Sequence, residues 1–382
     1  MTATEKEELL LDIKGKSQES LSCYNLEQAI KLCINSIYGA FANDYFHFRS
    51  TEIAETVTLQ GQDAIKHTEA AVEKYFKEFW HRDKALHEAM GITEEVQPLK
   101  RTVWKYTDTD SGYIIFEEVM ESCNWDGEVD DFILKINEHR LAAYIKQVLG
   151  KYADSYNSEN FLDFELETIA QNAIWVAKKK YVQNIVWKDG KEYEPLSYIS
   201  TKGLEIIQSS TPAFCRDKLT ELVKFLFTKD KLDNDTVAGL TQVLKEIKKE
   251  FQLADIEQIS SNRRIGDYNK FVINDTNEFE LFKGCPIHVR AGGYHNYLIN
   301  NSSHKNNFDL IKTSDRIRWY YAKDQFCDVF GYNPGEYPYQ VAPKIDIERQ
   351  FEMFILEPIN RIIVPSGMPR LNRSLAYTIS LF

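Results

Sequence analysis

The chain lacks the features that mark membrane, secreted and zinc-binding proteins. No hydrophobic run approaches the roughly 20 residues that a membrane span needs, and the acidic start does not resemble a signal peptide. The six cysteines are scattered without a Cys-x-x-Cys pair, which argues against a zinc site and against a disulfide framework. We therefore expect a cytoplasmic protein with reduced thiols and no membrane partner.

Positive charge is also scarce. The chain has 46 Lys and Arg against 58 Asp and Glu, a net charge of −12, which argues against a nucleic-acid partner because phosphate neutralisation dominates such binding. Net charge averages over the whole surface, however, and a local basic stripe is enough. The sequence has such places at 178–180, at Arg263 and Arg264, and at Arg316 and Arg318. Charge alone therefore excludes no partner.

What the chain does contain is an ordinary globular composition, with 43% hydrophobic and 27% charged residues. Its 382 residues are enough for two or more domains. Several stretches have apolar residues at helical spacing, and two have the aromatic and apolar runs typical of strands. The helical stretches are 25–39, 54–80, 131–150 and 209–253, and the strand-like stretches are 103–116 and 161–188. The sequence thus predicts an α+β protein.

The most informative segment is the run 107–112, which stands between two apolar, aromatic stretches and is typical of a tight turn between strands. Side chains at i and i+2 of an extended chain project to one side, so Asp108 and Asp110 are expected to share a face at the hairpin tip. Mg²⁺ usually takes one or two carboxylates together with substrate phosphates. The alternative is an ordinary turn, in which aspartate is also common. On this segment alone the ordinary turn is favoured.

The helix expected from residue 25 carries Lys31, Asn35 and Tyr38 at i, i+4 and i+7, so all three project from one face. A cation, an amide and an aromatic ring on one stripe suit a triphosphate and the edge of a base pair. The alternative is a plain amphipathic helix with Tyr38 in the core and Lys31 in solvent. Taken alone, the helix favours that alternative.

A basic element follows. Lys178, Lys179, Lys180 and Tyr181 are expected inside a strand, where alternation would point Lys179 and Tyr181 to the same side. Such an element can lie along a nucleic-acid backbone, although lysines also protect edge strands from aggregation. The segment Ser209–Pro212 then predicts a helix start, with Ser or Thr as N-cap and proline at the first helical position. That helix terminus can hold a phosphate.

Taken in order, these motifs resemble the signature of family B DNA polymerases. The family has Lys-x-x-x-Asn-Ser-x-Tyr-Gly, then Tyr-x-Asp-Thr-Asp-Ser, then Lys-Lys-[Arg/Lys]-Tyr, and this chain has all three between Lys31 and Tyr181. Gly-Leu-Glu at 203–205 and Ser-Ser-Thr-Pro at 209–212 make it look most like the replicative polymerases of tailed phages, which would place it in the host cell cytoplasm. Thr107 stands where the family usually has glycine.

The resemblance implies a role for each matching residue. Lys31 would contact the triphosphate of the incoming dNTP, with Asn35 nearby. Tyr38 would lie against the minor-groove side of the nascent base pair, and Gly39 would leave room for it. These four residues would form the nucleotide-binding part of the fingers.

The resemblance likewise implies a metal site and a DNA contact. Asp110 would be a direct ligand of two catalytic Mg²⁺ ions, Asp108 a less direct carboxylate, and Glu167, on the strand before the basic element, a further acidic residue near the metals. Primer-template DNA would be held near the primer 3′ end by the basic element, mainly Lys179 and Tyr181, flanked by Lys178 and Lys180.

The implied architecture is an antiparallel palm sheet backed by helices. Residues 1–42 would be a lead-in and the C-terminal half of the fingers with its helix, 43–208 the palm, and 209–382 a mostly helical thumb with a C-terminal tail. The apolar tail 374–382 would dock on a sliding clamp, as in the resembled phage enzymes, or else pack or fray as an ordinary chain end.

Part of the family pattern is missing. The family has a second palm aspartate in a segment ending Ser-Leu-Tyr-Pro-Ser, upstream of the Lys31 helix, and the sequence contains neither that segment, nor the exonuclease motifs, nor the first fingers helix. Asp110 then lacks the carboxylate that completes the metal site, and Mg²⁺ binds such a half-site poorly. We therefore expect the C-terminal subunit of a split polymerase, whose N-terminal partner subunit carries the exonuclease and the missing aspartate.

Two other functions compete with this one. A non-catalytic DNA-binding or assembly remnant would have no need to keep Lys31, Tyr38, Asp110 and Lys179 together. A metal-dependent glycosyltransferase, holding a nucleotide-sugar on Asp108 and Asp110, would need a nucleotide-binding α/β region before them, whereas the preceding segment is helical. The sequence thus predicts a DNA-directed DNA polymerase subunit that transfers nucleotides to a primer 3′-hydroxyl by two-metal chemistry.

Overall fold

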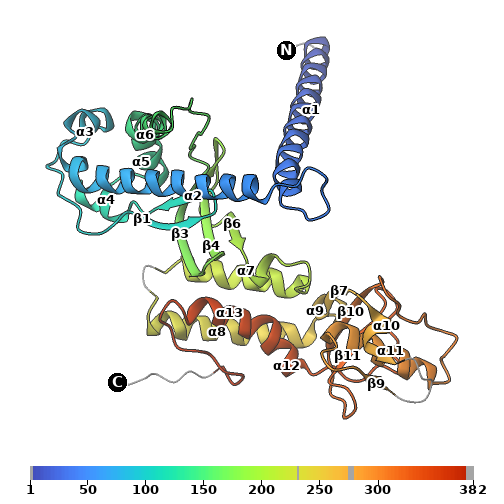
Figure 1. The fold of residues 1–382 in the computed structure, drawn as a ribbon. Helices are drawn as coiled ribbons and strands as arrows, with labels where there is room; N and C mark the ends of the chain where they lie inside the picture. Colours follow the sequence, from blue (N-terminus) through green and yellow to red (C-terminus); the bar gives the residue numbers. More distant parts are fainter. Residues whose placement is uncertain (1–2, 230–231, 274–278, 376–382) are drawn as a thin grey trace. The chain divides into compact units, whose positions relative to one another are not determined.

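The structure, a computed structural model, describes residues 3–229, 232–273 and 279–375. The chain divides into two compact units, Met1–Glu165 and Leu166–Phe382 (Figure 1). Every strand pair formed by the described residues is antiparallel, which confirms the α+β class. The boundary between the units falls inside the segment predicted as palm, and the functional division into fingers, palm and thumb stays a prediction.

Within the described ranges, no helix combines the length and the apolar character that a membrane span requires.

The first unit begins with two long helices, α1 (Ala3–Phe41) and α2 (Thr51–Lys74). α1 starts far upstream of the helix expected from residue 25 and passes through Gly39, which does not end it. The lead-in is rich in Glu, Lys and Leu and has no proline, and its single glycine costs only about 1 kcal/mol. α2 begins after Ser50, whose hydroxyl accepts a hydrogen bond from the Ile53 amide.

The predicted helix over 54–80 is confirmed. α2 continues without a break through a π-helical turn (Tyr75–Phe79) and a 3-10 turn (Trp80–Arg82). The predicted helix over 131–150 is confirmed as α5 (Val129–Ile136), a π-helical turn (Asn137–Leu141) and α6 (Ala142–Ser155).

The strands β1 (Trp104–Asp108) and β2 (Ser111–Ile114) form the predicted hairpin and pack on α2. The short helices α3 (Lys84–Met90) and α4 (Glu117–Ser122) complete the first unit. Its core is aromatic: Phe116 lies between Phe76 and Phe132, with ring centroids 5.9 and 6.2 Å away, and Trp80 packs on Phe132 at 6.3 Å. The hairpin thus packs against helices that share a tightly packed aromatic core.

The second unit begins with a four-stranded sheet in which β4 (Lys180–Lys188) pairs with β3 (Thr168–Ala177), β5 (Lys191–Glu192) and β6 (Tyr198–Lys202). β4 and β5 meet at a tight turn, where Asp189 and Gly190 have φ of 48° and 81°. The strand predicted over 161–167 is wrong. Those residues are irregular and mostly exposed, because their alternating apolar residues find no partner strand among the described residues.

A helical layer follows, made of α7 (Ala213–Phe227), α8 (Asn234–Leu253), α12 (Ile347–Phe351), a π-helical turn (Glu352–Leu356) and α13 (Glu357–Ile363). Its core includes Leu222, Leu240 and Ile359, all fully buried. Pro212 is the N-cap of α7 rather than its first residue, and no side chain caps the helix. The Thr211 hydroxyl donates instead to the Glu205 carbonyl at 2.7 Å.

The remaining part is a three-stranded sheet in the order β11-β10-β7, with α11 packed on it (Figure 1). The bounds are β7 (Ser261–Arg264), β10 (Arg316–Tyr321), β11 (Val329–Tyr332) and α11 (Ile287–Asn300), with short α9 (Ile256–Ile259), α10 (Tyr268–Phe271), β8 (Val272–Ile273) and β9 (Glu280–Leu281) around them. The sequence pattern did not predict this sheet. β10 reads Arg-Ile-Arg-Trp-Tyr-Tyr and buries side chains on both faces, so it lacks the alternation of a half-buried strand.

A matched pair of leucines tests the distribution of the core. Leu222 is fully buried, whereas Leu26 on α1 is 62% exposed. Leu222→Ala should lower the free energy of unfolding by about 2–5 kcal/mol through lost burial and a residual cavity. Leu26→Ala should change it by no more than about 0.5 kcal/mol. Chemical denaturation of the chain measures both, and equal losses would contradict the structure.

Candidate functional site

The loop of the β1–β2 hairpin has an unusual backbone. Asp108 pairs with Ser111, which leaves a loop of Thr109 and Asp110 alone. The Asp110 amide donates to the Asp108 carbonyl at 2.7 Å, and Thr109 has a φ of 62°. A β-branched residue rarely adopts this left-handed conformation. Such strain costs on the order of 1–3 kcal/mol and is found mainly where the surrounding structure holds a functional residue in place.

The Trp104 side chain holds the hairpin from one side. Its indole Nε1 donates to the Thr107 hydroxyl at 2.9 Å, and its ring covers Gly112 so closely that a Cβ there would lie 2.1 Å from it. The Trp104 amide also donates to the Glu73 carboxylate of α2 at 2.5 Å. Thr107, which replaces the glycine usual in the family, therefore lies in the strand as a hydrogen-bond acceptor and leaves the turn tight.

The two aspartates differ in exposure. Asp108 is only 3% exposed, and its carboxylate accepts a hydrogen bond from the Thr109 hydroxyl at 3.3 Å. Its carbonyl accepts from the Ser111 hydroxyl at 3.1 Å. Asp110 lies exposed in the loop. The hairpin thus offers one accessible carboxylate above one buried carboxylate.

This donor set suits Mg²⁺ in part. The ion favours oxygen ligands and commonly takes one or two carboxylates, leaving its other positions to water and substrate phosphates. Among the described residues, no group of three or more His, Cys, Asp or Glu side chains can hold a metal. Asp108 and Asp110 therefore fit the protein's contribution to a Mg²⁺ site but do not enclose an ion.

Glu167 is not on a strand as predicted. It is exposed, lies immediately before β3, and its carbonyl accepts a hydrogen bond from the Asp189 amide at 3.1 Å. It belongs to the second unit, and its role near the metals stays a prediction.

The nucleotide-binding candidates share α1. Lys31 and Asn35 are exposed and line a shallow depression with Ile30 and Ile34. Tyr38 is 43% exposed, and its hydroxyl lies 2.8 Å from that of Thr58 on α2. The alternative that Tyr38 packs in a core is wrong.

Gly39 stands in open space, because an added Cβ there would meet no atom within 4 Å. Its predicted role, leaving room beside Tyr38, stays a prediction.

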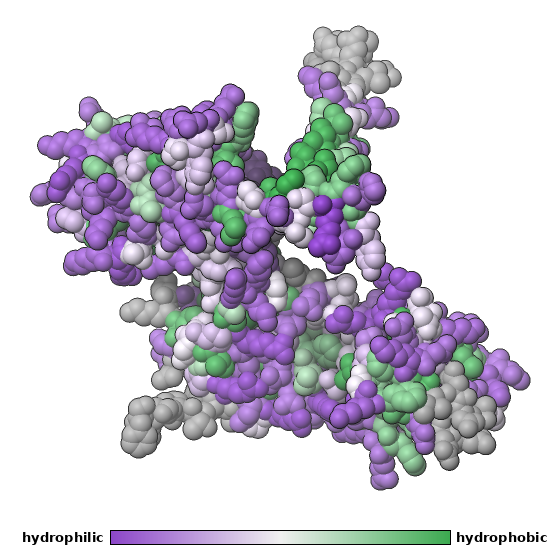
Figure 2. Space-filling model, in the orientation of Figure 1, coloured by the Kyte–Doolittle hydropathy of each residue, from purple (hydrophilic) through white to green (hydrophobic). Residues whose placement is uncertain are grey.

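Large apolar side chains of α1 are uncovered within the described residues (Figure 2). Those that are at least half exposed are distributed around the helix and comprise Leu21, Tyr24, Leu26, Ile30, Leu32, Ile34 and Ile37. An isolated helix of this kind normally gains its stability by packing an apolar face against another element. α1 therefore exposes apolar surface of a kind that helices of globular proteins usually bury.

The three lysines of the basic element lie at a hairpin turn, which corrects their predicted place inside a strand. Lys178 and Lys179 form the turn between β3 and β4, and Lys180 begins β4; all three are exposed. Lys179 has a φ of 60°. Gly203 supports the turn from behind, since a Cβ there would lie 2.2 Å from the Lys179 carbonyl oxygen.

Tyr181 does not point outward with Lys179. It is 5% exposed, packs on Trp175 with ring centroids 6.2 Å apart, and has the Lys202 ammonium 5.9 Å from its ring centroid. Because β4 pairs with β3 on one side and β6 on the other, the lysines do not serve to protect an edge strand. The three lysines form an exposed cationic tip on the β3–β4 hairpin.

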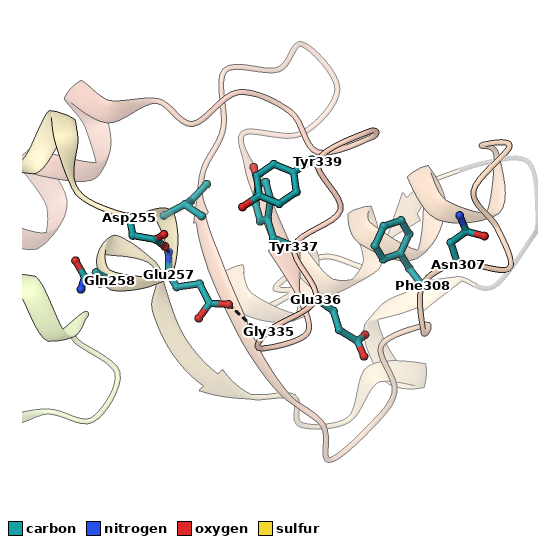
Figure 3. A pocket seen from close by; sticks show the side chains of 10 residues that line it. Asp255, Glu257, Gln258, Asn307, Phe308, Gly335, Glu336, Tyr337 and Tyr339 are labelled. Atoms are coloured by element: carbon teal, nitrogen blue, oxygen red, sulfur yellow. Dashed lines mark hydrogen bonds between the residues drawn. The ribbon is translucent and has the colours of Figure 1, made fainter.

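The second unit also contains a cleft of about 650 Å³ that includes none of the predicted residues (Figure 3). It is lined by Asp255, Glu257 and Glu336 together with Tyr337 and Tyr339, and the Glu257 carboxylate accepts a hydrogen bond from the Gly335 amide across it. Three carboxylates repel phosphate. This cleft is therefore unsuited to a nucleotide.

Sequence reasoning missed three supporting residues. Trp104 and Gly112 lie in or beside the aspartate motif, where the glycine after Asp-Ser was a usable signal for close packing. Thr58, the hydroxyl partner of Tyr38, carried no sequence signal, because the contact depends on how α1 meets α2.

The sequence is similar to known proteins over most of its length. Residues 10–365 match the profile of DNA polymerase family B. The chain is 24% identical over 276 residues to the DNA-directed DNA polymerase of Enterobacteria phage T4, covering 68% of this chain and 28% of that protein. It is 27% identical over 294 residues to the DNA-directed DNA polymerase of Escherichia phage RB69, covering 73% of this chain and 29% of that protein.

A third relative comes from an archaeon. DNA polymerase 1 of Aeropyrum pernix is 24% identical over 328 residues, covering 85% of this chain and 27% of that protein. The chain thus spans less than a third of the length of each of these relatives. Since the family profile matches most of the sequence, the chain belongs to DNA polymerase family B.

Proposed function

We propose that this chain takes part in DNA-directed DNA synthesis, adding nucleotides from dNTPs to the 3′-hydroxyl of a primer. The observation that carries the proposal is the strained two-residue loop. It keeps Asp110 exposed close to the buried Asp108, in the segment that resembles the catalytic carboxylate motif of the family.

In this proposal Asp110 is a direct ligand of Mg²⁺, and Asp108 is a supporting carboxylate. When bound, two such ions activate the primer hydroxyl and stabilise the leaving pyrophosphate. The protein's own contribution is to fix the carboxylates before substrate arrives, because charge stabilisation acts best when it needs no reorganisation. The bond from Trp104 to Thr107 and the strained Thr109 serve this purpose.

The exposed residues of α1 would bind the nucleotide, Lys31 and Asn35 at its triphosphate and Tyr38 beside the new base pair. The hydrogen bond between Tyr38 and Thr58 would hold the ring on α2. The cationic tip formed by Lys178, Lys179 and Lys180 would lie along the primer strand, since lysines contact phosphates without reading sequence.

We further propose that an N-terminal partner subunit, which also carries the exonuclease, supplies the carboxylate that completes the metal site. Two observations support this: no three-ligand group exists among the described residues, and large apolar side chains of α1 are uncovered there. Glu167 remains a proposed additional carboxylate. The proposed clamp contact falls largely on residues 376–382, outside the described part of the chain.

Loss of the exposed Asp110 carboxylate should slow DNA synthesis severely. Asp110→Asn is expected to lower the rate of single-nucleotide incorporation with Mg²⁺ by on the order of 100-fold or more, because one preorganised charge is lost where the transition state needs it. Rapid-quench primer extension measures this rate in the preparation that supports synthesis, with or without the N-terminal polypeptide.

Asp126→Asn is the matched control, since Asp126 is an exposed aspartate of the same unit outside the hairpin. It should stay within about twofold of the unaltered chain, as surface substitutions away from a site usually do. An Asp110→Asn variant that incorporates nucleotides at the unaltered rate would refute the proposed site.

The partner requirement is tested by reconstitution. The chain alone should extend a primer poorly, because two carboxylates leave Mg²⁺ too few protein ligands. An N-terminal polypeptide with the missing palm aspartate should restore extension, and the same polypeptide with that aspartate changed to asparagine should not. Robust DNA synthesis by the chain alone would show that no partner subunit is required.

A further inference from the structure

Two arginine pairs that are far apart in sequence meet on one sheet. β7 ends in Arg263 and Arg264, and β10 begins at Arg316. Their antiparallel register places Arg264 directly opposite Arg316 at the end of the β7–β10 pair in the β11-β10-β7 sheet. Both side chains are exposed. The strand pairing thus creates a cationic pair that neither segment contains by itself.

This arrangement is unfavourable without a ligand, because like charges directly opposite each other across two strands destabilise a sheet. Among the described residues, neither Arg264 nor Arg316 forms an ion pair, and the Arg264 Nε donates only to the Ser314 carbonyl at 3.1 Å. Most other arginines of this unit have a carboxylate partner. Those are Arg290, Arg318, Arg349, Arg361, Arg370 and Arg373.

The neighbouring arginines are not available in the same way. Arg263 pairs with the buried Ile317, so alternation puts its side chain on the other face. There, burial lowers the pKa of His288, and the charge of Arg263 lowers it further. Arg318 donates to the Glu257 carbonyl at 2.6 Å. Of these four arginines, Arg264 and Arg316 are thus the two that are directly opposite each other on one face of the sheet and have no ion-pair partner among the described residues.

Phosphate is the ligand that this geometry suits. A guanidinium presents a planar fork of donors that matches phosphate oxygens in pairs. Adjacent strands lie about 4.8 Å apart, so two long arginine side chains reach the same or neighbouring phosphates of one strand. Because both side chains are exposed at the end of a strand pair, they suit the backbone of a polymer better than a small ligand, which is normally enclosed in a pocket.

We propose that Arg264 and Arg316 form a phosphate clamp on the backbone of the DNA that the polymerase holds. The identification of DNA as the ligand rests on the proposed function. It contacts phosphates only, so it strengthens binding and fixes position without selecting sequence. A bound phosphate places negative charge between the two guanidinium groups. This offsets the repulsion between them that the strand register causes.

The test is the salt dependence of DNA binding by the full chain. Fluorescence anisotropy with a labelled primer-template duplex, without nucleotide, gives the affinity from 50 to 200 mM KCl. The double variant Arg264→Gln/Arg316→Gln should lower the slope of log affinity against log salt by about 2, as loss of two phosphate contacts requires. The loss of affinity across this range should then be roughly 10-fold smaller than for the unaltered chain.

Arg370→Gln is the matched control, because Arg370 is an exposed arginine of the same unit that is paired with Glu357. It should leave the slope unchanged. The thermal midpoint of the double variant should stay level or rise, since the variant removes like-charge repulsion; a structural role for the pair would lower it. An unchanged slope in the double variant, or no salt-dependent binding by the unaltered chain, overturns the clamp.

The clamp and the proposed function fail separately. Asp110→Asn should bind the duplex with the unaltered slope, because Asp110 contributes no phosphate contact of its own. A chain that shows the two-contact slope change but never extends a primer, with or without the N-terminal polypeptide, refutes the proposed function and leaves the clamp standing. A chain that synthesises DNA while the double variant keeps its slope refutes the clamp alone.

Discussion

The close packing of Trp104 on Gly112 is the constraint on which the candidate site depends. The indole of Trp104 on β1 lies where any side chain at Gly112 on β2 would be, and its nitrogen donates to the Thr107 hydroxyl of its own strand. Because the packing of Trp104 on Gly112 joins the two strands, it fixes the register of β1 against β2. That register leaves only Thr109 and Asp110 for the loop. The left-handed Thr109 and the exposed Asp110 are its direct consequences.

Charge in this chain is organised locally rather than globally. The net charge is −12, yet the tip of the β3–β4 hairpin carries Lys178, Lys179 and Lys180, and the β7–β10 pair carries Arg264 and Arg316. Acidic residues gather elsewhere, for example around the cleft at Glu257. A DNA-handling protein needs cations only where phosphates lie. An acidic remainder keeps the rest of the surface from holding nucleic acid without specificity.

The sequence predicted well what local chemistry decides. The hairpin at Asp108 and the long helices follow from turn residues and periodicity. The sequence-based prediction was wrong where the secondary structure depends on pairing with distant segments. The segment 161–167 has a strand-like pattern but no neighbouring strand, and the basic element became a turn because Gly203 gives the backbone at Lys179 room to reverse.

The candidate site was predictable to a similar degree. Asp108 and Asp110 stood out because two carboxylates flanked by apolar strands are a local pattern. Their unequal burial depends on the register that Trp104 sets, and no pattern in the sequence encodes it. The pairing of Arg264 with Arg316 was equally hidden, since it joins segments about fifty residues apart through a sheet that the aromatic-rich sequence did not reveal.

If the hairpin is the preformed half of a two-metal site, as we propose, it should bind Mn²⁺ weakly by itself and much more tightly in the complete complex. Electron paramagnetic resonance measures this binding with and without the N-terminal polypeptide, primer-template and dNTP. We expect weak binding by the chain alone, much tighter binding in the complex, and loss of both in Asp110→Asn. Tight binding by the chain alone, or binding that Asp110→Asn leaves unchanged, would contradict the proposal.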